Sequence, residues 1–376
     1  MTCLLTEEQT FIQKAARDFA RGEFDDDQIL DLMEKQQFPK KTLKTACKLD
    51  LIGLTWPESA GGQECGIMDS VLVTEELCRR DSTMGLALSF ADAGAETVAR
   101  FGTPEQIKAL NAPLLKGKSV TALICPELGQ EPGPICYRKT DDTLVLNGEA
   151  SVVVNADIAD FFLTVAHPED GQGERILLLF PKDMPGIAVS ELIKKLGMDM
   201  THWNSVKFES TRVSTGTMIT CDTKGVDPVN ILEKNLLIKT GAMFLGMAQG
   251  AFDLALGYAK EREQFRRKIA AFQGISQKIA AMYTRLQEGR ASVYSAARAC
   301  DKKCVGLTDL IAAQLSAQHL AEYLTDEALQ IHGGVGYMIE FPVEHFFRDV
   351  KCLRTLLGRN ITRMDLISRR LIGQLN

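Results

Sequence analysis

Three long segments in the second half of the chain carry the spacing of amphipathic helices, and they constrain the fold more than any other feature. They cover residues 230–262, 270–300 and 307–332, each about 30 residues long with few internal helix breakers. In the second segment, apolar side chains recur at steps of three and four residues from Ile269 to Leu286. Helices of this length, joined by short connections, bury their apolar faces against one another. The pattern therefore predicts a C-terminal four-helix bundle over residues 227–376.

Helical spacing also dominates the first part of the chain, residues 1–117. Thr6 precedes two glutamates and Thr103 precedes Pro104, and both have the composition of helix starts. After Thr6, apolar residues recur every four positions, as on one face of a helix. Further helices are expected at Lys41–Leu51, Met68–Cys78 and Ser89–Phe101. These residues predict an N-terminal helical domain.

The composition changes near Gly117. From Ser119 to about Asp222, short β-branched runs alternate with turn residues, without a repeated βαβ pattern. Asn147-Gly148 falls between two such runs and predicts a hairpin turn. Residues 118–226 are therefore expected to form a middle antiparallel β domain, a barrel or a sandwich. The predicted fold class is α+β multidomain, in the order helical domain, β domain, helix bundle.

Charge and hydropathy exclude several classes of protein. With 43 Lys and Arg against 49 Asp and Glu, the net charge of −6 offers no general attraction to nucleic acid. No stretch has the ~20 uninterrupted apolar residues that membrane insertion needs. The N-terminus has neither a basic leader nor an apolar secretory core, so the protein is expected in the cytoplasm. Its ten cysteines are then expected to be reduced thiols. Cys300 and Cys304 lack a second Cys or His pair at suitable spacing, so no metal site is expected.

Short motifs recur along the chain in the order of these domains. They are Leu5-Thr6-Glu7-Glu8-Gln9, Pro57-Glu58 with Gly61-Gly62, Glu75-Glu76-Leu77, Phe101-Gly102-Thr103-Pro104-Glu105-Gln106, Arg262-Glu263-Gln264-Phe265 with Phe272-Gln273, Gln330-Ile331-His332-Gly333-Gly334-Val335-Gly336-Tyr337, and Arg348-Asp349-Val350-Lys351. Together they resemble the acyl-CoA dehydrogenase family, and the resemblance covers nearly the whole chain. It implies a tetrameric flavoprotein that removes an α-proton and a β-hydride from an acyl-CoA and passes electrons from FAD to an electron-transferring flavoprotein.

The catalytic base that the resemblance implies is missing. In most members of the family it is a Glu that follows an Arg-Asp-x-Lys motif, and that position is Leu357 here. Other members carry the base on the first bundle helix, where this chain has Leu236, and the Arg that usually follows is also absent. A carboxylate is needed to take the α-proton, so no catalytic residue is expected in this chain.

The family segments that hold the isoalloxazine ring are also altered. Glu131 replaces a Ser in the loop that corresponds to residues 125–132. The Trp-Ile-Thr-Asn strand that stacks on the ring corresponds to Val152-Val153-Val154-Asn155, which lacks the aromatic ring and the hydroxyl donor. A bulky cation, Arg359, follows the usual base position in place of a small Thr. The resemblance thus implies that one complete active site has been lost.

A second group of family residues is retained. By resemblance, each FAD lies across a subunit boundary, and a chain lends an Arg, a Phe and a Gln-x-x-Gly-Gly segment to the pyrophosphate and adenosine of its neighbour's FAD. Guanidinium groups pair with phosphate oxygens, and glycines let a backbone approach them. The residues in these positions are Arg262, Phe265, Gln273, Gln330, Gly333 and Gly334.

The asymmetry favours a catalytically degenerate subunit of a heteromeric FAD-dependent acyl-CoA dehydrogenase. Its partner would be a related catalytic subunit that binds the acyl-CoA, in a dimer or an α2β2 tetramer. One alternative is a self-contained homotetrameric acyl-CoA dehydrogenase or enoyl-CoA reductase with a displaced base. Glu233 or Asp253 could be that base, although both are expected to be surface charges. The other alternative is a non-enzymatic scaffold of the same fold.

Overall fold

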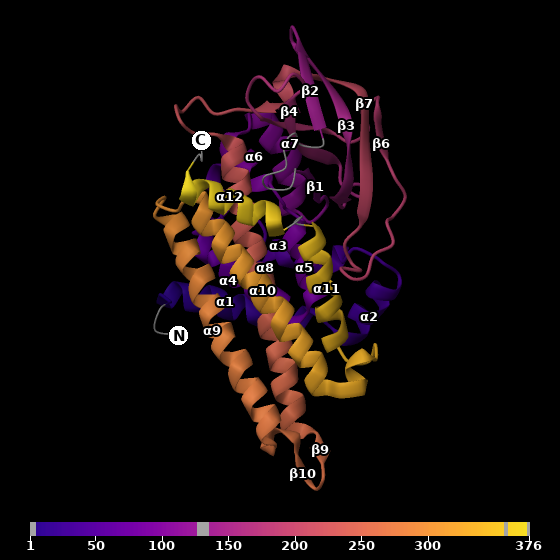
Figure 1. Cartoon of the computed structure of the whole chain (residues 1–376). Coiled ribbons are helices and arrows are strands. Elements are labelled where there is room, and N and C mark those ends of the chain that lie inside the picture. Colours follow the sequence, from indigo (N-terminus) through magenta and orange to yellow (C-terminus); the bar gives the residue numbers. More distant parts are fainter. Residues whose placement is uncertain (1–4, 126–134, 357–359, 374–376) are drawn as a thin grey trace.

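The computed structural model describes residues 5–125, 135–356 and 360–373. Helices, then strands, then helices follow one another along the chain (Figure 1). This order confirms the predicted α+β fold class, with a C-terminal helix bundle. In the described part of the chain, no helix combines the length and the apolar character that a membrane crossing requires. Leu357, Arg359 and Glu131 lie outside the described residues.

The N-terminal part is helical and begins as expected. The Thr6 hydroxyl accepts a hydrogen bond from the Gln9 amide at 3.1 Å, and Thr103 caps a second helix in the same way. Its helices are α1 (Glu7–Glu23), α2 (Asp26–Glu34), α3 (Lys40–Lys48), α4 (Ile67–Arg80), α5 (Ser82–Phe90), α6 (Ala95–Phe101) and α7 (Pro104–Leu115), with the short 3-10 helix η2 (Glu58–Ala60).

The single helix expected over Ser89–Phe101 is wrong, because α5 ends at Phe90 and α6 begins at Ala95. Gly94 lies between them with φ +80°, a left-handed conformation that favours glycine. A Cβ at this position would come within 2.5 Å of Leu163, so the turn also packs too closely for a larger residue. The helical spacing continues across the break, which is why the sequence pattern did not reveal it.

The middle part is a mixed sheet. Its eight strands are β1 (Thr121–Ile124), β2 (Ile135–Thr140), β3 (Thr143–Val154), β4 (Phe161–Pro168), β5 (Ile176–Pro181), β6 (Ile187–Val189), β7 (Trp203–Ser214) and β8 (Met218–Ile219). Among the described residues the order is β6-β7-β3-β2-β4-β5-β8, with β1 paired to β4. Most pairs are antiparallel, as expected, but β1–β4 and β2–β4 are parallel.

The hairpin predicted at Asn147-Gly148 is wrong. Both residues lie inside the continuous strand β3, where the pairing with β7 shifts register between Leu146 and Gly148. The side-chain Oδ1 of Asn147 accepts a hydrogen bond from the Ser210 backbone amide of β7 at 2.8 Å. The Asn-Gly pair therefore forms an irregularity within a strand rather than a turn. The β2–β3 turn lies at Asp141, which has φ +51°.

The C-terminal part consists of long helices, as the three periodic segments predict. These are α8 (Pro228–Glu261), α9 (Gln273–Asp301) and α10 (Leu307–His332), followed by the 3-10 helix η5 (Gly333–Tyr337), α11 (Val343–Leu356) and α12 (Asn360–Ile372). A short hairpin of β9 (Glu263–Gln264) and β10 (Arg267–Lys268) joins α8 to α9. Figure 1 shows this hairpin at the end of the bundle opposite the β-sheet.

The Glu75-Glu76 motif connects helices rather than forming a catalytic site. The Glu75 carboxylate pairs with Arg290 at 2.7 Å and accepts a hydrogen bond from the Tyr294 hydroxyl at 2.6 Å, so that α4 is joined to α9. Glu76 pairs with Arg17 of α1 at 2.6 Å. Both glutamates are buried, and a buried charge persists only when it is paired and hydrogen-bonded.

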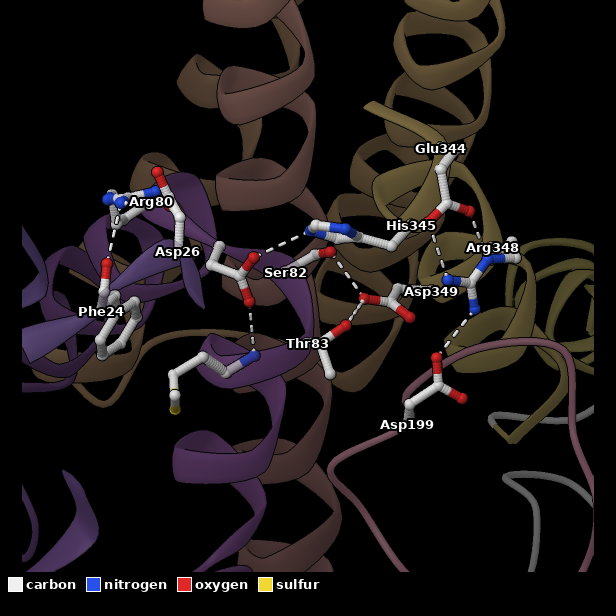
Figure 2. A network of polar contacts seen from close by, with 12 residues as sticks. Phe24, Asp26, Arg80, Ser82, Thr83, Asp199, Glu344, His345, Arg348 and Asp349 are labelled. Atoms are coloured by element: carbon white, nitrogen blue, oxygen red, sulfur yellow. Dashed lines mark hydrogen bonds and ion pairs between the residues drawn. The ribbon is translucent and has the colours of Figure 1, made fainter. Parts of the chain in front are cut away.

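A buried polar network joins all three parts of the chain (Figure 2). The Asp349 carboxylate of α11 accepts hydrogen bonds from the hydroxyls of Ser82 and Thr83 at 2.6 and 2.5 Å, and from the Met198 amide of the β6–β7 connection. One turn earlier, the His345 ring lies 2.8 Å from Asp81. Burial alone would lower the pKa of His345, but the Asp81 carboxylate raises it above its usual value. We call these residues the three-part junction.

Candidate functional site

The six retained residues gather at one end of the bundle, which we call the distal end. Arg262 directly follows α8, Phe265 lies in the β9–β10 turn and Gln273 begins α9. Gln330 is in the last turn of α10, and the remaining two residues open η5. All six are exposed in the single chain: Arg262, Phe265, Gln273, Gln330, Gly333 and Gly334.

Ring contacts hold the distal end together. The Tyr258 ring on α8 stacks on the His332 ring at the end of α10, with 4.4 Å between centroids. This contact places the segment before Arg262 beside the segment that precedes Gly333. His332 also bonds to the Ala328 carbonyl at 2.8 Å, and burial lowers its pKa, so the ring is neutral at pH 7. A neutral, stacked histidine has a packing role here rather than an acid–base role.

The β9–β10 turn displays Phe265 to solvent. Phe265 and Arg266 have φ +50° and +64°, the combination of a two-residue hairpin turn with both central residues left-handed. This conformation is costly for residues other than Gly, Asn and Asp. The Phe265 side chain is nevertheless 88% exposed, with only an edge contact to Phe272. A strained turn that presents an exposed aromatic ring indicates a binding surface.

The distal end is suited to a phosphate group. Positive side chains follow Arg262 along the hairpin at positions 266, 267 and 268, and Lys268 is paired with Glu263 at 2.8 Å. A Cβ at Gly333 or Gly334 would meet no atom within 4 Å, so an approaching ligand has free access to this backbone. Guanidinium groups and open backbone together fit the pyrophosphate of a dinucleotide such as FAD. The β9–β10 hairpin lies at the opposite end of the molecule from the chain's own sheet (Figure 1).

Leu236, one of the two positions that the family uses for the base, lies elsewhere, beside a small pocket of about 80 Å³ that we call the base pocket. Leu236 lines it, as does Leu356, the residue before position 357. The only ionisable side chain among the described lining residues is Cys125, and burial raises the pKa of its thiol to about 12. A thiol with that pKa cannot accept a proton at pH 7. The lining residues are Phe90, Ala93, Thr121, Leu123, Cys125, Val152, Val154, Leu236 and Leu356.

Strand β3 contains residues 152–154, which correspond to the strand that stacks on the flavin ring in the family. Val152 and Val154 of β3 line the base pocket, so the side chains there are aliphatic. Asn155 is fully buried with φ +62°, its amide donates to the His202 carbonyl at 2.7 Å, and its side-chain oxygen accepts from the His202 amide. The two β3 side chains that line the pocket, Val152 and Val154, therefore supply no hydrogen-bond donor for the polar edge of an isoalloxazine ring.

Neither candidate for a displaced base reaches the base pocket. Glu233 was expected at the surface, but this expectation is wrong: its side chain is buried and pairs with Arg175 of the β4–β5 connection. The apolar faces of α8 contact both neighbouring parts of the chain, so a charge on this helix can be interior and paired. Asp253 is partly exposed and pairs with Arg79 at 2.7 Å. Both carboxylates thus hold helices and strands together.

The comparisons with known proteins identify the family. Family models for the N-terminal, middle and C-terminal domains of acyl-CoA dehydrogenases match residues 6–118, 130–211 and 238–372. The chain belongs to the acyl-CoA dehydrogenase family. An acyl-CoA dehydrogenase of Bacillus subtilis is 32% identical, and the match covers 98% of this chain and 99% of the relative. The family is one of oxidoreductases that act on acyl-CoA thioesters with a bound flavin.

Other similar proteins include reductases and chains of larger assemblies. A subunit of the caffeyl-CoA reductase–Etf complex of Acetobacterium woodii is 30% identical over 98% of this chain and 99% of its own length. A chain from the structure of the electron transferring flavoprotein of Acidaminococcus fermentans superposes with a TM-score of 0.88 at 27% identity, covering 98% of this chain and 99% of that chain. Butyryl-CoA dehydrogenase from Megasphaera elsdenii superposes with a TM-score of 0.87 at 26% identity, covering 98% and 99%.

Proposed function

We propose that this acyl-CoA dehydrogenase family member is the catalytically degenerate subunit of a heteromeric complex. In this complex its distal end completes the FAD site of a related catalytic subunit, and the partner binds and oxidises the acyl-CoA. The observation that carries the proposal is an asymmetry: exposed, phosphate-compatible residues at the distal end, and a base pocket whose described lining contains no carboxylate.

The geometry of the distal end supports a role for another chain's cofactor. The β9–β10 hairpin, which directly follows Arg262 and carries Phe265 in its turn, lies at the end of the bundle opposite the β-sheet (Figure 1). Phe265 holds its exposed ring on a left-handed backbone, with φ +50°, a conformation that is costly for a residue other than Gly, Asn or Asp.

The base pocket supports the loss of catalysis. A positioned general base contributes roughly 10²–10⁴-fold to a proton transfer, and the described lining of this pocket supplies only a neutral thiol. Glu233 and Asp253 are committed to ion pairs and cannot substitute without breaking them. Proton removal from an acyl-CoA is therefore assigned to the partner's carboxylate.

We further infer that electrons leave the complex through an electron-transferring flavoprotein. Two similar proteins, one from the caffeyl-CoA reductase–Etf complex and one from the structure of an electron transferring flavoprotein, support this partner. The second subunit is expected to be another chain of this family that retains the Glu, in a dimer or an α2β2 tetramer with one FAD for each pair of chains.

Co-expression tests the proposal. The chain is purified alone and together with a homologue that carries the catalytic Glu, and flavin content and acyl-CoA oxidation are measured for both. The proposal expects flavin and activity only in the complex. Stoichiometric FAD and turnover in the chain alone would contradict it.

A second candidate is a self-contained homotetramer that reduces an enoyl-CoA. Its support is that two relatives are a 3-(aryl)acrylate reductase and an acryloyl-CoA reductase, 30% and 28% identical to this chain. Anaerobic reduction of an enoyl-CoA by the isolated chain would decide for this candidate. A flavin-free native assembly would instead favour a scaffold.

A further inference from the structure

A second cavity adjoins the base pocket, and we call it the inner cavity. It runs between α4, α5, the α5–α6 turn and the first half of α8, and has a volume of about 70 Å³. One water molecule needs about 10–15 Å³ by this measure, so the inner cavity can hold several non-hydrogen atoms. Phe90, Ala93 and Leu236 line both the inner cavity and the base pocket. The two spaces are therefore neighbours that these three side chains bound in common.

The inner cavity contains an ion pair that no motif in the sequence indicates. Lys239 of α8 lies 2.5 Å from Asp92 of the α5–α6 turn, and both side chains are mostly buried, at 24% and 11% exposed. Lys239 follows Leu236 by three residues, which is about 4.5 Å along the same helix face. An acyl chain that passes Leu236 would therefore reach this ion pair next.

Further polar groups line the same cavity. The Thr97 hydroxyl is buried, and among the described residues it has no hydrogen-bond partner. Asn235 also lines the cavity, as does Glu96, which pairs with Arg100 at 3.0 Å. A buried hydroxyl without a partner is unfavourable, so this arrangement is stabilised when a guest supplies a hydrogen bond.

The charges in the cavity balance. Lys239 neutralises Asp92, and Arg100 neutralises Glu96. A carboxylate or an ammonium group would enter without a free counter-charge, whereas an aliphatic tail would cover the ion pair without any hydrogen bond in return. The environment favours a neutral group that both donates and accepts hydrogen bonds.

We propose that the inner cavity binds the far end of an acyl chain that carries a hydroxyl group, with Lys239 and Asp92 as the residues that select it. The proposal goes beyond the assignment of a degenerate subunit, because it concerns binding in this chain's own cavity and needs neither a base nor a flavin. It names a substrate class for thioesters that this chain itself holds, separate from the acyl-CoA that the partner oxidises.

The test compares two thioesters that differ only in the terminal group, hexanoyl-CoA and 6-hydroxyhexanoyl-CoA. Their dissociation constants are measured by titration calorimetry on the full-length chain, alone and in the complex with a Glu-bearing homologue. The expected result is tighter binding of the hydroxylated compound by about tenfold, the effect of one buried hydrogen bond. Equal binding, tighter binding of hexanoyl-CoA, or no measurable binding of either compound would overturn the proposal.

A double variant, Asp92→Asn with Lys239→Met, removes both charges without leaving either one unpaired. It should lose the preference, whereas Lys234→Met, on the same helix but outside the cavity lining, should keep it. A double variant that folds and retains the preference would show that other residues select the group. The flavin content of each sample is recorded separately, so failure of this proposal and failure of the degenerate-subunit proposal give different results.

Discussion

Replacing Asp349 with alanine should destabilise the protein strongly, because this carboxylate is the centre of the three-part junction. It is fully buried and accepts three hydrogen bonds, from Ser82, Thr83 and the Met198 amide. Hydrogen bonds to a charged acceptor contribute about 1.5–3 kcal/mol each. Removing a buried carboxylate also relieves a desolvation cost of several kcal/mol, the same cost that raises the pKa of Asp349. The expected net loss in the free energy of unfolding is about 3 kcal/mol.

Asp349→Asn distinguishes this account from a simple loss of volume. The asparagine oxygen can still accept from the Met198 amide, and the hydroxyls of Ser82 and Thr83 can rotate to accept from its NH₂ group. We therefore expect a loss of only about 1 kcal/mol for this variant. Asp365→Ala on α12 is the control: this carboxylate is half exposed in an ion pair with Arg369, and its loss should change stability by less than about 0.5 kcal/mol.

Urea unfolding followed by tryptophan fluorescence measures all three variants. The two tryptophans, Trp56 in the N-terminal part and Trp203 on β7, are both buried, so their emission reports loss of structure in two parts of the chain. An unchanged midpoint for Asp349→Ala would refute the reasoning. An asparagine variant at least as unstable as the alanine variant would do the same.

Three further predictions concern the junction and the two sites. The folded-state pKa of His345 lies above its usual 6.5, so the stabilisation by its pairing with Asp81 is complete below pH 6.5 and is lost as the pH rises through the folded-state value. The variant His345→Gln should therefore show a flatter decrease in unfolding free energy above pH 6.5. An equally steep decrease in the variant would contradict the assignment. Arg262→Ala should lower flavin retention of the complex on gel filtration by about tenfold or more, whereas Arg369→Ala, a charge on α12, should not; equal flavin content would remove Arg262 from the cofactor site. Leu236→Glu places a carboxylate in the base pocket. Acyl-CoA oxidation by the chain alone should still stay near background, because Val152 and Val154 supply neither the aromatic stacking nor the hydroxyl donor that an isoalloxazine ring receives in the family. Substantial turnover would show that only the base had been lost.

The sequence predicted features that depend on local spacing. The three long bundle helices follow from apolar periodicity, and the caps at Thr6 and Thr103 follow from side-chain chemistry. The hairpin prediction at Asn147-Gly148 was wrong because the same dipeptide occurs both in hairpin turns and in irregular strands. Which of the two forms here depends on pairing with Ser210, which lies 63 residues away. Glu233 misled because its partner, Arg175, belongs to a different part of the chain.

The candidate sites also differ in whether their residues belong to short sequence motifs. Arg262 and Gly333 occur in short motifs, so the distal end could be anticipated from the sequence, although its role in FAD binding remains a proposal. The ion pair of Lys239 and Asp92 could not, since 147 residues separate its partners and neither belongs to a motif. One local signal was present: Lys239 stands one helical turn after Leu236, on the face that a family member would use for its base.

The ratio of FAD to polypeptide in the purified chain, alone and bound to a Glu-bearing homologue, tests the central claim most directly. We predict no stoichiometric FAD and no acyl-CoA oxidation for the chain alone. For the complex we predict one FAD for each pair of chains, with activity that disappears when the partner's Glu is replaced by Gln. A full complement of FAD in the lone chain, together with turnover of an acyl-CoA, would contradict the account.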